Sequence, residues 1–388
     1  MSTSEPLKIG FLFSSSGVTG LQESSQLRGA MQALDEVNDS GGIDGREVIA
    51  VRYDPQSQDA LFRSFAERLI LADKVNVIFG GYRSSARKIM LPVVEKYNRL
   101  LFYPQLYEGF EFSEHIIYGG AAPNQNGVQL AEFMAGNFGA RVYMIGSRYV
   151  YPYECNRNMQ ELILQNENGA VIGERYLGLD APYEEFVQVI DDVIKKQPDF
   201  IFSSAIGQTI SYLYQAYARA GLDPMKIPIG SLNTSETELA AMGVEFGAGH
   251  YTSAPYFQAV NSAENQRALE GFRKRYGSDI SADMNWEASY YQFHLFANAC
   301  AAAGSDSIAP LKFELLGSEY AAPQGRVKID RKNQHTGLYP RIGRADAAGQ
   351  FTVLRESREM VAPDPYMSTQ SFGDWVTKLT TAGYADGG

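Results

Sequence analysis

Apolar and polar positions alternate along the chain with two different periods. Short apolar runs rich in β-formers and bounded by turn residues predict strands, and four of them fall in the first hundred residues: 8–14, 46–54, 75–81 and 99–104. Between the first two runs, apolar residues recur at helical spacing, namely Leu27, Ala30, Met31, Leu34 and Val37. This order predicts a parallel sheet covered by helices on both faces.

Two further helices are predicted in this region, over 57–73 and from Ser84 onward. Pro92 should kink or end the second one, because proline cannot donate a backbone hydrogen bond to the preceding turn. The alternation then restarts at residue 141 and continues through 141–147, 154–168, 171–178, 183–196, 199–206, 208–220 and 227–233. Two series of one motif predict two similar lobes.

The pattern after residue 250 is mixed. A strand is expected at 250–257, helices at 262–277 and 286–303, and a polar, β-leaning stretch at 325–344. The segment after Trp375 is rich in Gly, Thr and Ala, and residues 377–388 are expected to be frayed.

Length and charge narrow the picture further. A chain of 388 residues, 45% hydrophobic and 20% charged, is globular and too long for one core. The formal net charge of −11 argues against direct binding of nucleic acid or an anionic membrane. The densest basic cluster, Arg273–Lys274–Arg275, is expected to be a solvated helix face. Cys155 and Cys300 could pair, but free thiols are expected because two cysteines do not form a disulfide framework.

A signal peptide consists of a basic segment, an apolar stretch and a cleavage site, and the residues before the first strand contain none of these. No apolar run approaches the roughly 20 residues of a membrane span. The chain as written therefore predicts a cytoplasmic protein, whereas a trimmed leader would place it in the periplasm.

No enzymatic constellation is visible in the sequence. The four histidines are isolated, and neither a GxSxG nucleophile motif nor a GxxxxGK[ST] phosphate loop occurs. Carboxylate pairs such as Asp191/Asp192 lie on predicted exposed helix faces. We expect a protein that binds a ligand without a metal, a cofactor or catalysis.

Hydroxyl and phenol groups gather where the predicted strands end. Ligands of open α/β sheets bind beyond the carboxyl ends of the strands. The stretch VIFGGYRSS (77–85) joins such an end to a helix start at Ser84 and Ser85, whose backbone N–H groups suit a carbonyl oxygen or an anion. Ser84 could equally be only an N-cap. Tyrosines occur at several of these ends and could enclose a small ligand: Tyr82, Tyr103, Tyr107, Tyr149 and Tyr151.

At these residues the chain resembles the periplasmic-binding-protein family of the leucine/isoleucine/valine type. The stretch ALDEVNDSGGIDGREV is similar to the family's first helix-to-strand segment. Other stretches resemble its short-chain amide and urea branch, among them GGYRSSARKIMLPVVEKYNRLLFYPQLYEGFE, YGGAAPNQNG, SRYVYPYECN, APQGRVKIDRKNQH and PDPY. The resemblance covers about residues 7–376.

The resemblance implies two doubly wound parallel-sheet lobes joined by three crossovers. Lobe one would take 1–122 and 258–327, and lobe two 123–257 and 328–376. A short amide would lie between them. From the first lobe the resemblance implies ligand contacts by Tyr82, Ser84, Ser85, Tyr103, Pro104 and Gln105. From the second lobe it implies contacts by Tyr149, Tyr151 and Thr234.

Two departures from the branch concern the ligand. Gln105–Leu106 matches neither the Thr-Pro of the amide sensors nor the Val-Gln of the urea binders. An inward Gln105 would add a donor and an acceptor to the pocket. Arg83 replaces an apolar residue, and a buried Arg83 would favour an acid, although strand alternation predicts that it turns outward.

The branch implies two functions that share one pocket. The first is a cytoplasmic amide sensor that negatively regulates an amidase operon by sequestering an RNA-binding antiterminator protein. The second is the solute-binding component of a urea or amide ABC transporter that works with a membrane permease. A third hypothesis, an amide hydrolase, predicts loss of substrate. A homo-oligomer is possible in each case.

Overall fold

The computed structural model describes residues 5–367 and 379–381, which form two compact α/β units. Of the described residues, unit 1 comprises 5–107, 111–120 and 262–338, and unit 2 comprises 108–110, 121–261, 339–367 and 379–381. Apart from the short segment Glu108–Phe110, the chain passes from one unit to the other after Gly120, Asn261 and Leu338. The predicted α/β fold with two parallel-sheet lobes and three crossovers is confirmed.

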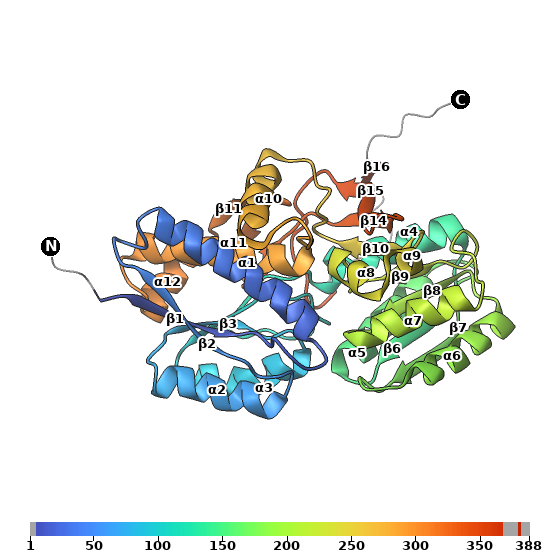
Figure 1. Ribbon diagram of the computed structural model, residues 1–388, viewed down its shortest axis with the longest axis horizontal. Helices are drawn as coiled ribbons and strands as arrows, with labels where there is room; N and C mark the ends of the chain where they lie inside the picture. Colours follow the sequence, from blue (N-terminus) through green and yellow to red (C-terminus); the bar gives the residue numbers. More distant parts are fainter. Residues whose placement is uncertain (1–4, 368–378, 382–388) are drawn as a thin grey trace. The chain divides into compact units, whose positions relative to one another are not determined.

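Unit 1 is built on a five-stranded parallel sheet in the order β2-β1-β3-β4-β5. Its strands are β1 (Leu7–Leu12), β2 (Val48–Tyr53), β3 (Val77–Gly80), β4 (Leu100–Tyr103) and β5 (Ile116–Tyr118). Its helices are α1 (Gly20–Asp39), α2 (Asp59–Leu71), α3 (Ser84–Lys96), α10 (Ala263–Tyr276), α11 (Met284–Ala303) and α12 (Ile308–Leu315). Figure 1 shows α2 and α3 on one face of this sheet and α1 and α11 on the other. Strands β3 and β4 are buried throughout, as expected for a sheet covered on both faces.

A small antiparallel sheet completes unit 1. It consists of β11 (Glu319–Ala322), β12 (Gly325–Ile329) and β13 (Thr336–Gly337). Residues 328–338, which the resemblance assigned to lobe two, belong to unit 1 because β12 pairs with both β11 and β13. His335 also bridges to Tyr118 at the end of β5, and the two rings stack.

Unit 2 has an eight-stranded sheet in the order β16-β15-β14-β10-β9-β8-β6-β7. Its strands are β6 (Arg141–Ser147), β7 (Ala170–Leu177), β8 (Phe200–Ser204), β9 (Ile229–Ser231), β10 (Tyr251–Ala254), β14 (Arg341–Ala345), β15 (Phe351–Ser357) and β16 (Leu379–Thr381). Its helices are α4 (Gly127–Phe138), α5 (Val150–Ile163), α6 (Tyr183–Lys196), α7 (Gln208–Arg219), α8 (Glu236–Met242) and α9 (Val244–Gly247), preceded by a 3₁₀ turn at Pro123–Gln125. Strands β6 to β10 pair in parallel.

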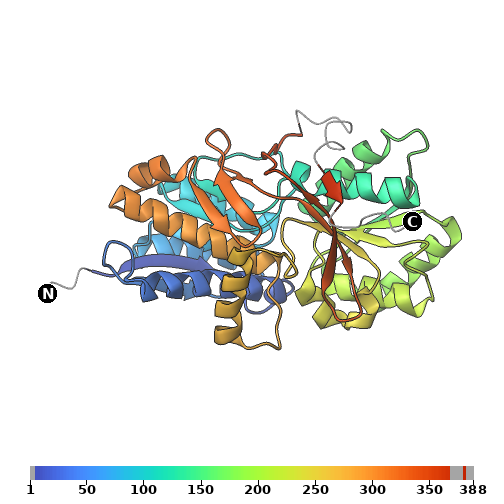
Figure 2. The ribbon, with the colours of Figure 1, turned by 90° about the horizontal axis from the view of Figure 1, so that it is seen from above.

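The antiparallel strands β14 and β15 continue the sheet of unit 2 beyond β10. Figure 2 shows these two strands beside β10. Within the segment 377–388, which was expected to be frayed, Leu379–Thr381 pair with β15. The remaining residues of that segment lie outside the described residues.

Two helices differ from the sequence pattern. Helix α3 does not end at Pro92 but runs on to Lys96, and Met90, Val93 and Val94 are buried around the proline. One missing backbone hydrogen bond is therefore offset by burial. Helix α5 begins at Val150 rather than near residue 154, because a proline such as Pro152 is tolerated in a first turn.

Helix α1 buries polar side chains together with apolar ones. Leu27, Met31 and Val37 of its apolar stripe are only half-buried, whereas its N-terminal half buries a polar group made of Gln22, Glu23, Ser25 and Gln26. Partners on other elements compensate the cost of desolvation. Ser25 donates to Asp283 at 2.6 Å, and Gln32 accepts from the indole N–H of Trp286 at 3.0 Å.

Helices α1 and α11 also approach each other closely at Gly29. A Cβ built on Gly29 would lie 2.1 Å from the carbonyl oxygen of Trp286. Since the contact is with backbone, the neighbour cannot move aside by changing a rotamer.

We therefore expect Gly29→Ala to lower the free energy of unfolding by roughly 1–3 kcal/mol, the usual cost of overpacking. Urea unfolding followed by circular dichroism measures it. Gly136→Ala is the matched control, because Gly136 lies in α4 and its new Cβ would meet no atom within 4 Å. The control should be stabilised by about 0.5–1 kcal/mol. Equal changes in the two variants would contradict the close crossing.

Candidate functional site

The stretch VIFGGYRSS forms the carboxyl end of β3 and the start of α3. Gly80 and Gly81 have φ values of 153° and 84°, and a Cβ on Gly80 would lie 2.1 Å from the carbonyl oxygen of Leu12. Two glycines are therefore required where β3 passes close to β1 and turns into the helix. The turn leaves Tyr82 and Ser84 buried, at 3% and 1% exposure.

Ser84 is the first residue of α3 and not its N-cap. Arg83 occupies the N-cap position, and no side chain caps the helix. The backbone N–H groups and the positive dipole at the start of a helix suit an acceptor. Ser84 Oγ accepts a hydrogen bond from Arg87 Nη1 at 3.3 Å, and half-buried Ser85 donates from its hydroxyl to Asp59 at 3.1 Å.

Arg83 is neutralised within unit 1. Its side chain is 11% exposed, Nη2 lies 2.7 Å from Asp59 Oδ1, and it also donates to the carbonyl of Ser57. Arg83 was expected to turn outward, and its side chain is directed to the start of α2. Its charge is directed to α2, because Asp59 begins that helix and provides a carboxylate at the required position.

A fully buried arginine supports the tyrosines at the end of β4. The guanidinium of Arg87 lies over the rings of Tyr103 and Tyr107, at 4.9 and 4.7 Å from their centroids. Arg87 Nε donates to Glu111 at 2.6 Å, which compensates the buried charge and helps to lower the pKa of Glu111 against the opposing effect of its burial. Tyr103 donates its hydroxyl to the carbonyl of Tyr82 at 2.6 Å. Tyr103 therefore fixes the turn that carries Tyr82.

Sequence reasoning missed Arg87 and Glu111. The signal for Arg87 was its helical position, since Arg87, Met90 and Val94 lie on one face of α3 and are all buried. Nothing in the sequence marks Glu111 as its partner.

Gln105 lies directly after the buried Pro104 and is 4% exposed. Gln26 of α1 donates from Nε2 to the carbonyl of Pro104 at 3.1 Å and to Gln105 Oε1 at 3.0 Å. In the described part of the chain, Gln26 Oε1 is buried without a hydrogen-bond partner, and none is present for Gln105 Nε2. The two touching amides thus leave the Gln26 acceptor buried and unpaired, and the Gln105 donor without a hydrogen bond to a described residue. Sequence reasoning anticipated an inward Gln105 but not Gln26.

Unit 2 places a second polar group at the ends of β6 and β9. Tyr149 is the N-cap residue of α5, and Tyr151 lies in its first turn with 2% exposure. Asn233 Nδ2 donates to the Tyr151 hydroxyl at 3.0 Å, and burial raises the pKa of Tyr151 well above its ordinary value. The phenol therefore remains protonated, and its hydroxyl also lies within donating distance of Asn233 Oδ1, at 3.3 Å. The rings of Tyr149 and Tyr151 are 6.2 Å apart.

Thr234 is 1% exposed and its hydroxyl is occupied by protein partners. It donates to Ser231 at 2.9 Å and lies 3.0 Å from the hydroxyl of Tyr214. This geometry gives Thr234 a part in the turn after β9.

Reactive groups are held in unreactive states. Cys155 and Cys300 are free and buried, as expected, and burial raises the pKa of both thiols. Burial lowers the pKa of His250 to about 3 and that of His335 to about 4, so both rings are neutral. No group of three or more His, Cys, Asp and Glu residues suited to a metal ion occurs in the described ranges.

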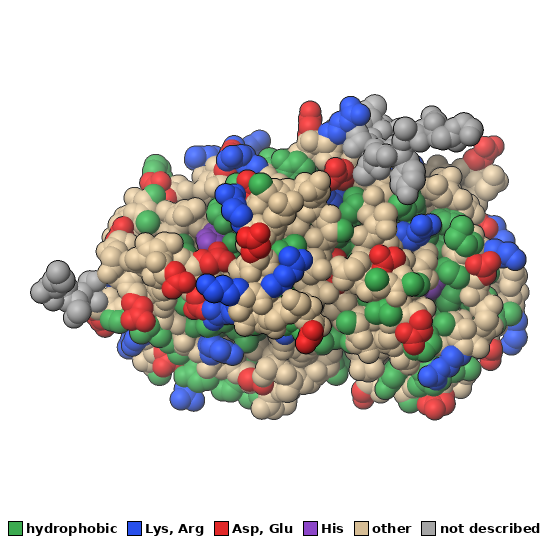
Figure 3. All heavy atoms as spheres, turned by 45° about the horizontal axis from the view of Figure 1, so that its top comes forward, with side chains coloured by type: hydrophobic (Ala, Val, Ile, Leu, Met, Phe, Trp, Pro, Cys, Tyr) green, Lys and Arg blue, Asp and Glu red, His purple; other side chains and the backbone are tan. Residues whose placement is uncertain are grey.

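Acidic and basic side chains are interspersed on the face shown in Figure 3, with no continuous basic surface formed by described residues. In the described part of the chain, no helix is long and apolar enough to cross a bilayer.

Two α/β units whose parallel strands end in buried amide, hydroxyl and phenol groups define a ligand-binding class of protein. The chain belongs to the periplasmic binding protein family, because the profile of the Periplasmic binding protein domain matches residues 7–372. The leucine/isoleucine/valine type is supported by its relatives. This is a family of solute-binding proteins.

Curated relatives are distant. The Leu/Ile/Val-binding protein homolog 6 of Brucella suis is 23% identical over 336 residues, covering 85% of each chain. The Leucine-specific-binding protein of Salmonella typhimurium is 20% identical over 361 residues, with 90% of this chain and 94% of that protein covered. A limonene hydroxylase of Geobacillus stearothermophilus is 28% identical over 127 residues, only 23% of its length.

Solved structures share the fold. A solute-binding protein of an ABC transporter from Rhodopseudomonas palustris, in complex with p-hydroxybenzoic acid, has a TM-score of 0.83 at 21% identity, over 94% of this chain and all of that one. A branched-chain amino acid transporter substrate-binding protein from Streptococcus pneumoniae, in complex with isoleucine, has a TM-score of 0.79 at 19% identity, with 92% of this chain and 100% of that chain covered.

A buried carboxyl group beside the Gln26 amide gives unit 1 a pH dependence. Glu23 is fully buried and accepts from the Ser14 backbone N–H at 2.7 Å and from the Thr19 hydroxyl at 2.6 Å. Burial raises its pKa from the ordinary 4.5 to about 7, against the opposing effect of these hydrogen bonds and of the charge of Arg83.

Between pH 4.5 and 7 the folded state therefore holds a proton that the unfolded state has released. Glu23 should make stability fall as pH rises through this window, by about 3 kcal/mol in total. Urea unfolding at several pH values should show this slope in the parent and lose it in Glu23→Gln. Glu67→Gln, on the exposed face of α2, should retain it. A parent-like slope in Glu23→Gln would contradict the assignment.

Proposed function

We propose that this protein is the solute-binding component of an ABC-type uptake system and that its solute is a small neutral amide or urea-like molecule. The observation that carries the proposal is the Gln26–Gln105 contact. A primary amide or urea offers an N–H to the buried, unpaired Gln26 Oε1 and a carbonyl to Gln105 Nε2, which makes no hydrogen bond to a described residue. A carboxylate offers only acceptors, so it would leave Gln26 Oε1 unpaired.

The charges at the ends of β3 and β4 also favour a neutral solute. Arg83 is paired with Asp59 and Arg87 with Glu111. Both guanidinium groups thus have a carboxylate partner already, and a carboxylate solute would find no uncompensated arginine there.

The candidate residues of each unit, taken separately, are proposed to have different tasks. In unit 1 the start of α3, at Ser84 and Ser85, would offer hydrogen-bond donors, and Tyr82 would offer an aromatic ring. Tyr103 and Pro104 would hold the residues next to them in position. In unit 2 Tyr151 provides a phenol held by Asn233, Tyr149 provides an adjacent ring, and Thr234 stabilises the turn. We propose binding without bond cleavage, because both thiols and the imidazoles of His250 and His335 are buried and neutral.

The transporter role is supported by the printed names of the relatives and structural neighbours, which are binding proteins of transport systems. It fits an exported protein better than a cytoplasmic one. Stretches such as GGYRSSARKIM and YPYECN resemble the amide and urea branch of the family, and we propose that the chain belongs to this branch. Within that branch the alternative to transport is a sensor that sequesters an RNA-binding antiterminator.

Solute binding should be visible as a thermal shift with acetamide, propionamide, butyramide or urea. At a hundredfold excess over Kd, binding stabilises by about 2.7 kcal/mol, which raises Tm by roughly a few degrees in a chain of this size. Acetate should give no shift. A larger shift with acetate than with every amide would contradict the neutral-solute proposal, and a decline of the free amide with time would indicate a hydrolase.

The substitution Gln105→Glu tests the contact between Gln26 and Gln105 on which the proposal rests. Glutamate retains the acceptor for Gln26 but removes the free donor, so amide affinity should fall about 5- to 150-fold, the cost of an unpaired buried group. Ser84→Ala and Tyr151→Phe should weaken binding in the same range. Gln188→Glu on the exposed face of α6 is the matched control and should bind as the parent does. Calorimetry measures all four; parent-like affinity in Gln105→Glu would refute the role of this amide.

Transport and sensing can then be separated with the full-length gene product. The transporter role predicts recovery in the periplasmic fraction and stimulation of amide uptake by the cognate permease. The sensor role predicts retention in the cytoplasm and an RNA-binding partner that is released on addition of the amide. Amide-sensitive capture of such a partner would overturn the transporter assignment.

A further inference from the structure

Ser84, at the start of α3, lies between two residues that bind the same carboxylate oxygen. Arg83 Nη2 donates to Asp59 Oδ1 at 2.7 Å, and the hydroxyl of Ser85 donates to that oxygen at 3.1 Å. Asp59 is the first residue of α2, so the start of one helix holds the start of the other on both sides of Ser84. The position of Ser84 therefore depends on a residue of a neighbouring helix.

The β2–α2 loop, residues 54–58, leads into Asp59 with an uncommon backbone conformation. Gln56 and Ser57 have φ values of 54° and 55°, in the left-handed region that residues other than glycine rarely adopt. Two such residues in succession cost free energy and persist only where surrounding contacts fix them. The carbonyl of Ser57 accepts a hydrogen bond from Arg83 Nη2, the same atom that donates to Asp59. The strained loop therefore presents a carbonyl and a carboxylate to one guanidinium group.

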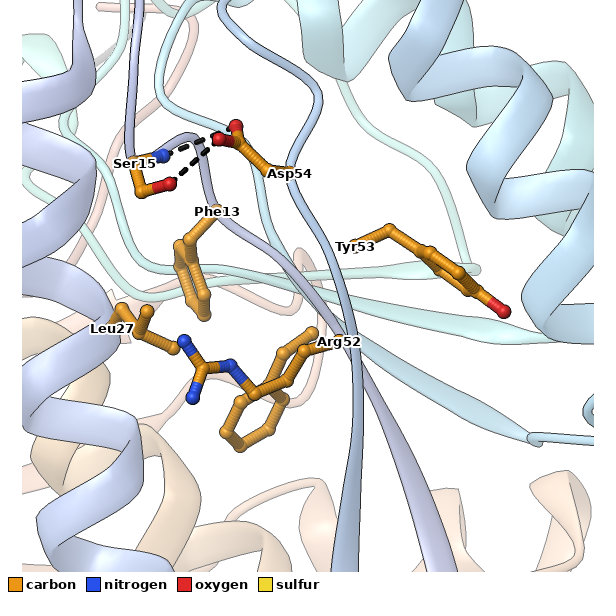
Figure 4. A pocket seen from close by; sticks show the side chains of 7 residues that line it. Phe13, Ser15, Leu27, Arg52, Tyr53 and Asp54 are labelled. Carbon is orange, nitrogen blue, oxygen red and sulfur yellow. Dashed lines mark hydrogen bonds between the residues drawn. The ribbon is translucent and has the colours of Figure 1, made fainter.

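Hydrogen bonds from the loop between β1 and α1 fix this conformation. Asp54 accepts from the Ser15 backbone N–H at 3.2 Å and from the Ser15 hydroxyl at 2.6 Å (Figure 4). It also accepts from the Gln56 backbone N–H at 2.8 Å. Burial opposes ionisation of Asp54, but its hydrogen bonds outweigh this effect and lower the pKa of the carboxyl group. The Ser57 backbone N–H donates to the hydroxyl oxygen of Ser14 at 2.9 Å, so both left-handed residues are held through their backbone.

Asp59 also compensates a positive charge beside Ser84. Arg83 occupies the N-cap position of α3, directly before Ser84, and its side chain is only 11% exposed. Without the carboxylate of Asp59, this guanidinium would add its charge to the positive end of the helix dipole. Both would then attract an anion.

We propose that Asp59 is a positioning and specificity-determining residue of the amide site, an inference that rests on the proposed function. Asp59 holds Ser84 in place through Arg83 and Ser85. It also compensates the charge of Arg83, so that the start of α3 selects a neutral solute over a carboxylate. Arg83 and Asp59 act as a pair, because an apolar residue in place of Arg83 would bring no charge that needs compensation.

Calorimetry on the full chain tests the charge compensation, with acetate and whichever of acetamide, propionamide, butyramide and urea binds the parent most tightly. Asp59→Asn keeps the shape of the side chain but removes its charge. Affinity for the neutral solute should fall about 5-fold or more, and the ratio of acetate affinity to neutral-solute affinity should rise about 10-fold or more. A merely structural role would not favour acetate. Glu67→Gln, on the same helix and paired with Arg63, is the matched control and should keep the affinity and the ratio of the parent.

Two double variants separate the two tasks of Asp59. Arg83→Leu combined with Asp59→Asn lacks both charges and should return the acetate ratio to that of the parent. Ser84→Ala combined with Asp59→Asn completes a double-mutant cycle. If Asp59 acts on the solute through Ser84, Asp59→Asn should cost much less affinity in the Ser84→Ala variant than in the parent.

Three results would overturn the inference while leaving the proposed function intact. The first is an acetate ratio in Asp59→Asn equal to that of the parent. The second is a raised ratio that persists when Arg83→Leu is added. The third is a loss of affinity in Asp59→Asn that is as large in the Ser84→Ala variant as in the parent. A parent that binds none of the amides and no urea would instead refute the proposed function, and this inference with it.

Discussion

The buried guanidinium of Arg87 is the interaction on which the candidate site of unit 1 depends. An arginine without solvent is tolerated only when a carboxylate and hydrogen bonds compensate its desolvation, and Glu111 provides that carboxylate. The aromatic faces of Tyr103 and Tyr107 enclose the cation. Tyr103 then holds the carbonyl of Tyr82. A single compensated charge thus fixes the geometry of the turn between β3 and α3.

Pairing of charges explains the chemical character of the candidate site in unit 1. Where β3 and β4 end, the arginines are paired with Asp59 and Glu111. The groups that remain to bind a solute are therefore neutral amides and hydroxyls. This arrangement favours a neutral polar solute.

The family assignment and the local chemistry answer different questions. Membership of the periplasmic binding protein family gives solute binding and the two-unit architecture. The solved relatives share the fold at about one-fifth identity, so their benzoates and amino acids do not carry over to this chain. The solute must be inferred from side chains, and Gln26 with Gln105 provides the most specific pattern of donors and acceptors.

The sequence alone determined the order of strands and helices, the parallel sheets and the polar strand ends, because periodicity and turn chemistry act over short distances. It also pointed to Tyr82, Ser84, Gln105 and Tyr151. It could not determine which polar groups are satisfied, since the partners are remote: Gln26 lies 79 positions from Gln105, and Asn233 lies 82 from Tyr151. The polar face of α1 was missed because hydrophobic spacing assumes that polar residues are solvated. Only tertiary packing decided that Arg83 and Arg87 are neutralised.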